Sequence, residues 1–152
     1  MAHSFIVALG ADHGGVALKN RLAAALIEMG HEVQDYGTDG TASVDYPDFA
    51  HAVCAAVEEK RVDYGILVCG TGIGMSITAN RHRGIRCGLV HDVTTACLTR
   101  AHNDANVLAL GARIIGEEVA LDILRIFLTT EFEGGRHERR LAKLNQATEP
   151  TL

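Results

Sequence analysis

The chain has 152 residues, of which 47% are hydrophobic, enough for one ordinary domain with a single buried core. Its net charge of −5 and its 5% of aromatic residues exclude the positive field and the stacking surfaces of a nucleic-acid-binding protein. It has no apolar run of about 18–20 residues, as a membrane-spanning helix needs, and its first residues lack the features of a signal peptide. We therefore expect a cytoplasmic protein that binds neither nucleic acid nor membrane.

The hydrophobic pattern alternates between short apolar runs and segments with helical spacing. It predicts five strand–helix units, with strands at 5–10, 32–36, 64–69, 86–90 and 107–110, and helices at 16–29, 47–59, 74–80, 93–101 and 117–129. Apolar strands joined by helices predict a parallel sheet that is covered on both faces. The expected fold class is α/β, a three-layer α/β/α sandwich with a five-stranded parallel, Rossmann-like sheet.

The C-terminal segment differs in composition from these units. A polar helix is expected over residues 137–146, followed by a frayed tail over residues 147–152. No repeat, linker or low-complexity segment marks a second domain, so residues 1–152 are expected to form one domain.

The four cysteines show no CxxC spacing, which argues against a disulfide framework and against a thiolate zinc site. Free thiols fit a reducing compartment. We expect no bound metal.

Ligands of open parallel sheets gather beyond the carboxyl ends of the strands. Cys69 ends the third strand and is followed by three alternating glycines, whose N–H groups can converge on an oxygen anion. The helix that follows favours the thiolate of Cys69, which makes it a candidate base. A buried core cysteine is an equally weighted alternative from spacing alone.

Asp12 and His13 follow the first strand and offer a carboxylate and an imidazole at the same edge. The alternative is an N-capping Asp beside a surface histidine. His102 and Asn103 follow the fourth predicted helix, where they would ordinarily be loop residues. Because this position lies at the amino edge, His102 can join Cys69 only if a second subunit supplies it, which predicts a homodimer or homotetramer with a shared site.

Arg136 and Arg140 are four residues apart, so in a helix they share a face and can hold a phosphate together. The alternative is a solvated helix whose arginines pair with Glu133 and Glu138. Arg113, directly after the fifth strand, adds a cation at the ligand edge.

A nucleotide-binding module is the competing class of function, because glycine-rich turns also occur in dinucleotide sites and Asp92 lies about 20 residues after the loop glycines. The spacing of Gly70, Gly72 and Gly74 is one residue short of GxGxxG, and the chain leaves no room for a separate substrate domain.

Six motifs occur in order across about residues 5–145: GADHGG (10–15), DYP (45–47), CGTGIG (69–74), RAHNDAN (100–106), ALGAR (109–113) and EGGRHERR (133–140). With these motifs the chain resembles the ribose-5-phosphate isomerase B family, which also contains the subunits of galactose-6-phosphate isomerase. The resemblance implies an aldose–ketose isomerase of the pentose phosphate pathway that converts ribose 5-phosphate to ribulose 5-phosphate through a cis-enediolate, without cofactor or metal. A hexose-6-phosphate isomerase of the allose or galactose type is the alternative.

The resemblance also implies roles for single residues. Cys69 matches the catalytic base, Thr71 the residue that assists proton movement between the substrate oxygens, and His102, with Asp12, the group that opens the sugar ring. Further residues match substrate-binding positions: His13, Tyr46, Gly70, Gly72, Ile73, Gly74, Asn103, Arg113, Arg136, His137 and Arg140. Members of another branch use a glutamate further along the loop, where this chain has Met75.

Overall fold

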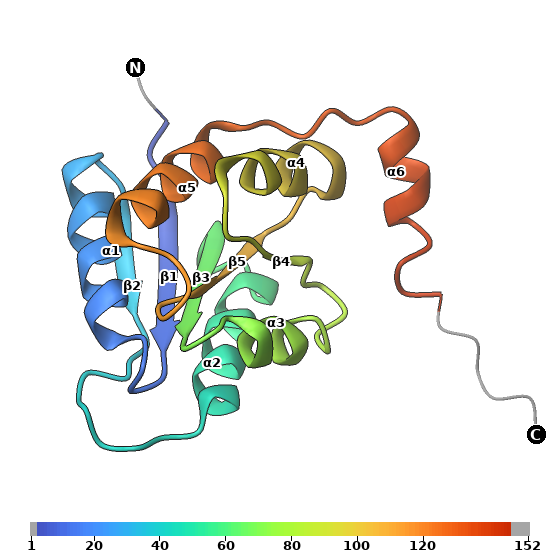
Figure 1. The fold of residues 1–152 in the computed structure, drawn as a ribbon. Coiled ribbons are helices and arrows are strands. Elements are labelled where there is room, and N and C mark those ends of the chain that lie inside the picture. Colours follow the sequence, from blue (N-terminus) through green and yellow to red (C-terminus); the bar gives the residue numbers. More distant parts are fainter. Residues whose placement is uncertain (1–2, 147–152) are drawn as a thin grey trace, which may run out of the picture.

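The computed structural model describes residues 3–146 and forms one all-parallel sheet between two helical layers (Figure 1). The elements are β1 (Ile6–Ala11), α1 (Val16–Glu28), β2 (Glu32–Asp35), α2 (Tyr46–Glu58), β3 (Tyr64–Cys69), α3 (Ile73–Ala79), β4 (Cys87–Leu89), α4 (Val93–Asn103), β5 (Val107–Gly111), α5 (Glu117–Thr129) and α6 (Arg136–Leu141). The strand order is β2-β1-β3-β5-β4. The predicted five-stranded three-layer α/β/α sandwich is confirmed.

Each face of the sheet buries its own apolar core. Leu108 and Leu110 of β5 pack with α1, α4 and α5, whereas Val107 and Ala109, which point to the other face, pack with α2 and α3. Neighbouring residues of a strand point to opposite faces, so a strand covered on both sides must be apolar throughout. This explains the continuous apolar runs in the sequence.

The sheet register defines two edges. Cys69 at the end of β3 pairs with Gly111 at the end of β5, and Gly65 near the start of β3 pairs with Val107 at the start of β5. Ala11, at the end of β1, pairs with Val68. The carboxyl ends of β1, β3 and β5 therefore meet at one edge, where the candidate loops follow.

Two helices differ from their predicted extents by two residues or more. α4 continues to Asn103, so His102 and Asn103 lie in its last turn and not in the following loop. The helix ends there because Asp104 adopts a left-handed conformation, with φ of 44°. α6 begins at Arg136 and ends at Leu141, with residues 142–145 in turns, where a helix was expected to run on to residue 146. The expected frayed tail, residues 147–152, lies outside the described residues.

Within residues 3–146, none of the helices combines the length and the apolar character that crossing a membrane requires.

Candidate active site

The loop between β3 and α3 directs a backbone amide at a sulfur. Cys69 is buried, with 5% of its surface exposed, and its Sγ accepts a hydrogen bond of 3.1 Å from the N–H of Gly72. Gly72 has a φ of 77°, and a Cβ there would lie 2.7 Å from Leu89 Cδ1. The turn therefore requires glycine. A hydrogen bond donated to sulfur stabilises its negative form, as a base needs.

The polar neighbours of Cys69 come from the same loop and from the loop after β5. Thr71 is exposed, and its Oγ1 accepts a hydrogen bond of 3.2 Å from the N–H of Ile73. Arg113 donates its backbone N–H to the carbonyl of Gly70 at 2.9 Å, and its Cδ lies 3.5 Å from where a Gly70 Cβ would stand. Arg113 is thus held against the glycine-rich loop.

The loop after β1 lies beside this one, since a Cβ on Gly14 would be 3.8 Å from the amide nitrogen of Gly70. The Oδ1 atom of Asp12 accepts the N–H of Gly14 at 2.9 Å. The N-cap of α1 is Gly15 and has no side-chain hydrogen bond, so the alternative that Asp12 caps the helix is wrong. His13 Nδ1 accepts the N–H of Val44 at 3.2 Å, which leaves the exposed ring's Nε2 available.

Tyr46, the first residue of α2, completes this group. Its ring packs on Gly74 of α3, where a Cβ would stand 2.5 Å from the ring atom Cζ. The structure therefore brings together nine of the predicted site residues at the carboxyl edge: Asp12, His13, Tyr46, Cys69, Gly70, Thr71, Gly72, Gly74 and Arg113. Ile73, the first residue of α3, is also here and half of its surface is exposed.

A second group lies where the end of α4 meets α6. The rings of His102 and His137 are stacked, with centroids 4.4 Å apart and planes 16° apart. Glu133 Oε2 lies 3.4 Å from Nε2 of His137 and 3.9 Å from Nε2 of His102. Neither Arg136 nor Arg140 forms an ion pair within residues 3–146, so the alternative that they pair with Glu133 and Glu138 is not what the structure has.

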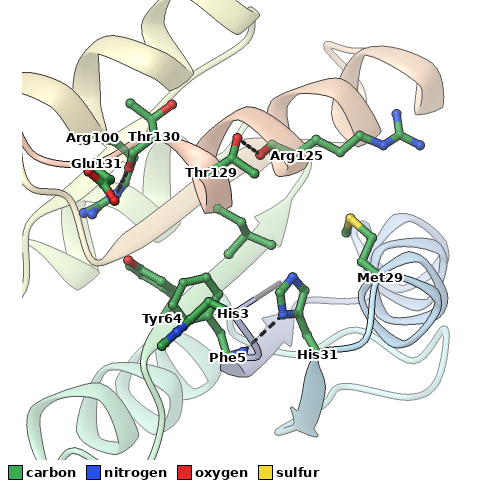
Figure 2. A pocket seen from close by; sticks show the side chains of 11 residues that line it. His3, Phe5, Met29, His31, Tyr64, Arg100, Arg125, Thr129, Thr130 and Glu131 are labelled. Carbon is green, nitrogen blue, oxygen red and sulfur yellow. Dashed lines mark hydrogen bonds between the residues drawn. The ribbon is translucent and has the colours of Figure 1, made fainter. Parts of the chain in front are cut away.

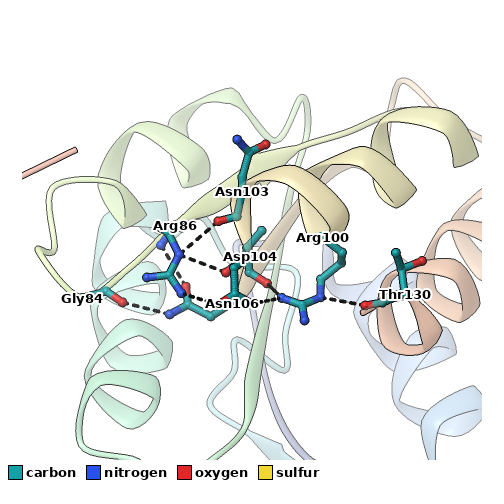
Figure 3. A network of polar contacts seen from close by, with 8 residues as sticks. Gly84, Arg86, Arg100, Asn103, Asp104, Asn106 and Thr130 are labelled. Carbon is teal, nitrogen blue, oxygen red and sulfur yellow. Dashed lines mark hydrogen bonds and ion pairs between the residues drawn. The ribbon is translucent and has the colours of Figure 1, made fainter. Parts of the chain in front are cut away.

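Charged contacts between distant segments hold the end of α4 (Figure 3). Oδ1 of Asp104 accepts a hydrogen bond of 2.9 Å from Nη1 of Arg100, and Oδ2 lies 3.5 Å from Nη2 of Arg86. Arg86 also donates to the carbonyl of Asn103 at 3.1 Å, and the Asn103 side chain points away from this network. Most of the RAHNDAN motif is therefore structural, which leaves the side chains of His102 and Asn103 available for a ligand.

The two groups are separated within one chain. The α4–α6 group lies beside the amino ends of β4 and β5, where Asn106 binds Arg86, whereas Cys69 lies at the carboxyl end of β3 (Figure 1). The four residue steps from Gly65 to Cys69 alone span about 13 Å at about 3.3 Å per residue. His102, Asn103, Arg136, His137 and Arg140 are therefore not brought to Cys69 by a single chain.

His102, Glu133 and His137 are also the residue types that bind metals, and their ligand atoms lie within 4.8 Å of one another. A metal bound by two imidazoles must lie close to the plane of each ring, along both nitrogen lone pairs. Two stacked rings with nearly parallel planes do not share such a point. The cluster as it stands is therefore not arranged for an ion.

A cavity at the amino edge of the sheet is lined by other residues (Figure 2). It has a volume of about 780 Å³ and is lined by Phe5, His31 and Tyr64 at the amino edge of the sheet, together with residues at the end of α5. None of the predicted site residues lines it. Chemistry, and not cavity size, therefore locates the candidate site.

Another predicted feature has a structural role. Asp92 is the N-cap of α4, and the N–H of Thr95, which donates to its Oδ1 at 2.7 Å, lowers the pKa of this carboxyl. That use argues against a ribose-binding role in a nucleotide site.

Two of the other cysteines are not suited to act as a base. Burial raises the pKa of Cys54 to about 12 and also raises the pKa of Cys87, so both stay protonated thiols.

The comparisons with known proteins cover both groups. The model of the family described as Ribose/Galactose Isomerase matches residues 7–144. The chain belongs to this family. Among ribose/galactose isomerases, ribose-5-phosphate isomerase B of Escherichia coli (strain K12) is 47% identical over 89% of this chain and 91% of its own length. D-erythrulose-4-phosphate isomerase of Pectobacterium atrosepticum is 42% identical over 91% of each chain.

A solved structure agrees with these relatives. The crystal structure of a ribose 5-phosphate isomerase from Thermotoga maritima matches with a TM-score of 0.94 and 47% identity, over 95% of this chain and all of that one. The range matched by the family model, residues 7–144, includes the carboxyl-edge loops and α6.

Proposed function

We propose that this protein is an aldose–ketose isomerase that interconverts ribose 5-phosphate and ribulose 5-phosphate, with Cys69 as the catalytic base. The observation that carries the proposal is the position of Cys69 Sγ, which faces the Gly72 amide in a glycine-rich loop beside Asp12 and Thr71. The names of the E. coli and T. maritima relatives support the pentose phosphate as substrate. The proposed reaction takes place in the cytoplasm and uses no cofactor.

The proposed active unit is a homodimer or a homotetramer, in which each site combines the two groups from different chains. The separation of Cys69 from His102 and Arg136 within one chain supports this assembly. Arg136 and Arg140 are exposed and have no ion-pair partner in residues 3–146. This supports a role in holding a ligand that is bound at the carboxyl edge of the partner subunit. A symmetric pair of chains would form two equivalent sites.

The reaction begins with the closed sugar ring. His102 of the partner subunit, assisted by Asp12, passes the proton of the anomeric hydroxyl to the ring oxygen, and the ring opens to an aldehyde. The Cys69 thiolate then takes the C2 proton, and the charge that develops on O1 is stabilised by the amides of residues 70–74. The same thiol returns the proton to C1, while Thr71 relays a proton between O2 and O1.

The phosphate group is held far from the reacting carbons. Arg136 and Arg140 bind its oxygens, together with His13. Binding energy gained there positions C1 and C2 against the sulfur, which is how a non-reacting group contributes to rate. Tyr46, Asn103 and Arg113 would contact the sugar hydroxyls.

A ribose 5-phosphate isomerase assay tests the proposal. Turnover to ribulose 5-phosphate is expected, and no turnover of any sugar phosphate would overturn it. Rates on allose 6-phosphate and galactose 6-phosphate that are lower than the rate on ribose 5-phosphate would decide against the hexose alternative. Erythrulose 4-phosphate is measured in the same series, because the relative from Pectobacterium is named as an isomerase of that sugar phosphate. Titration with NADH, with no binding expected, decides against a nucleotide-binding module.

A further inference from the structure

The carboxylate of Glu133 has no part in the reaction as described so far. Glu133 follows α5 in the segment that leads to α6, and 59% of its side chain is exposed. Its Oε2 atom faces Nε2 of both His102 and His137. Both imidazole nitrogens thus lie within ion-pair distance of one carboxylate oxygen, at 3.9 Å for His102 and 3.4 Å for His137.

The backbone of Glu133 is tied to the helix that carries His102. The N–H of Glu133 donates to the carbonyl of Ala101 at 3.0 Å, and Ala101 is the neighbour of His102 in the last turn of α4. The Glu133 main chain is therefore anchored to the same turn that carries His102. A change confined to the side chain leaves this anchor in place.

The two histidines are not equivalent. His137 is 5% exposed, whereas 37% of the His102 side chain is exposed. His102 is thus the ring that can reach a sugar, and His137 is the buried ring on which it stacks.

We propose that Glu133 is a positioning residue that keeps a proton on Nε2 of His102 and stabilises the imidazolium formed during ring opening. This inference rests on the proposed isomerase function. With Nε2–H facing the carboxylate, Nδ1 of His102 is the nitrogen with a free lone pair, as the second partner of an imidazole selects its tautomer.

The proton balance of the step is complete. Nδ1 accepts the proton of the anomeric hydroxyl, and the electrons of that O–H bond form the C1 carbonyl. The bond between C1 and the ring oxygen breaks, its electron pair stays on the ring oxygen, and that oxygen takes the proton from Nδ1. His102 ends the step neutral, and Glu133 remains a carboxylate throughout.

The two directions of the isomerase reaction separate this step from the chemistry of Cys69. Ribose 5-phosphate is a closed ring, whereas ribulose 5-phosphate carries its phosphate on O5 and stays open. In D2O, exchange of a C1 proton of ribulose 5-phosphate therefore reports enediolate formation without ring opening. The matched variants are Glu133→Gln and Glu131→Gln, since Glu131 is exposed in the same segment and forms no ion pair within residues 3–146.

Glu133→Gln is expected to lower kcat for ribose 5-phosphate about 10- to 100-fold, with KM little changed. C1 exchange should stay within about twofold of the unaltered enzyme, and Glu131→Gln should change neither rate. Equal losses in turnover and exchange, a rise in KM alone, or no loss at all would each overturn the role of Glu133. If the unaltered protein catalyses neither reaction, the proposed function itself is wrong.

Discussion

The carboxyl-edge loops and the α4–α6 corner are built in different ways. At the carboxyl edge, contacts within a few residues set the side chains, as in Cys69 with Gly72 and Asp12 with Gly14. At the corner, segments far apart in sequence meet: Arg100 donates to Thr130, and Glu133 faces His102. The proposed base is therefore placed by a loop, whereas the group proposed for ring opening is placed by tertiary contacts. A site that needs both depends on assembly more than on either part.

Removal of the sulfur tests the carboxyl-edge half most severely. Cys69→Ala is expected to lower isomerase turnover by about 10³-fold or more, because it removes the proposed base for the C2 proton. Binding of sugar phosphate, measured by calorimetry, should remain largely intact since the arginines are untouched. Turnover like that of the unaltered enzyme would contradict the assignment of Cys69 as base.

A mixing experiment tests whether the two halves come from different chains. Cys69→Ala and His102→Ala are each expected to be nearly inactive, but subunits unfolded and refolded together should recover about a quarter of full activity, since half of the dimers are hybrids with one intact site each. The activity of each variant refolded alone is the control. No recovery in hybrids verified by mass spectrometry would contradict the shared site.

Removal of one positive charge from the α4–α6 corner should weaken binding of the sugar phosphate. Arg136→Ala is expected to raise KM about 10- to 100-fold with a smaller change in kcat, as expected for loss of a charged hydrogen bond to phosphate. The matched control is Arg21→Ala, which removes an exposed arginine paired with Glu117. An unchanged KM would contradict the role in phosphate binding.

Addition of a single methyl group at Gly72 should show how much the stability of the protein depends on the conformation of this loop. Gly72→Ala is expected to cost about 2 kcal/mol or more of unfolding free energy, from a left-handed backbone and from contact with Leu89 and Leu110. Gly116→Ala is the control, because Gly116 has a negative φ and nothing within 4 Å of its added Cβ. Chemical denaturation measures both, and equal stabilities would contradict the steric argument.

Much of the fold and part of the site were predictable. Apolar runs such as residues 64–69 predict buried parallel strands, because both faces of such a sheet are covered. Loop contacts are local, so the position of Cys69 before a glycine-rich turn was enough to suggest a base beside an amide. The predicted end of α4, at residue 101, is two residues short. The helix ends at Asn103, before Asp104, whose carboxylate pairs with Arg100 and Arg86.

Other features gave no signal in the sequence. Arg86 lies 18 residues from Asp104, and its role depends on how the sheet brings β4 beside β5. The alternative interpretation pairs Glu133 with an arginine of α6, whereas in the structure Glu133 faces two histidines, and its backbone N–H is bound to α4. Arg100 and Asp104 are four residues apart, and this spacing in the sequence indicates their contact at the end of α4.

The sequence by itself determined the fold class, the motifs of the ribose/galactose isomerase family and the loop around Cys69, because each depends on local periodicity or on neighbours a few residues apart. Only the tertiary structure decided that His102 stacks on His137 beside Glu133, and that this group lies at the opposite edge from Cys69. The physical reason is that register and helix packing, which bring distant residues together, are set by the whole core and not by any one segment.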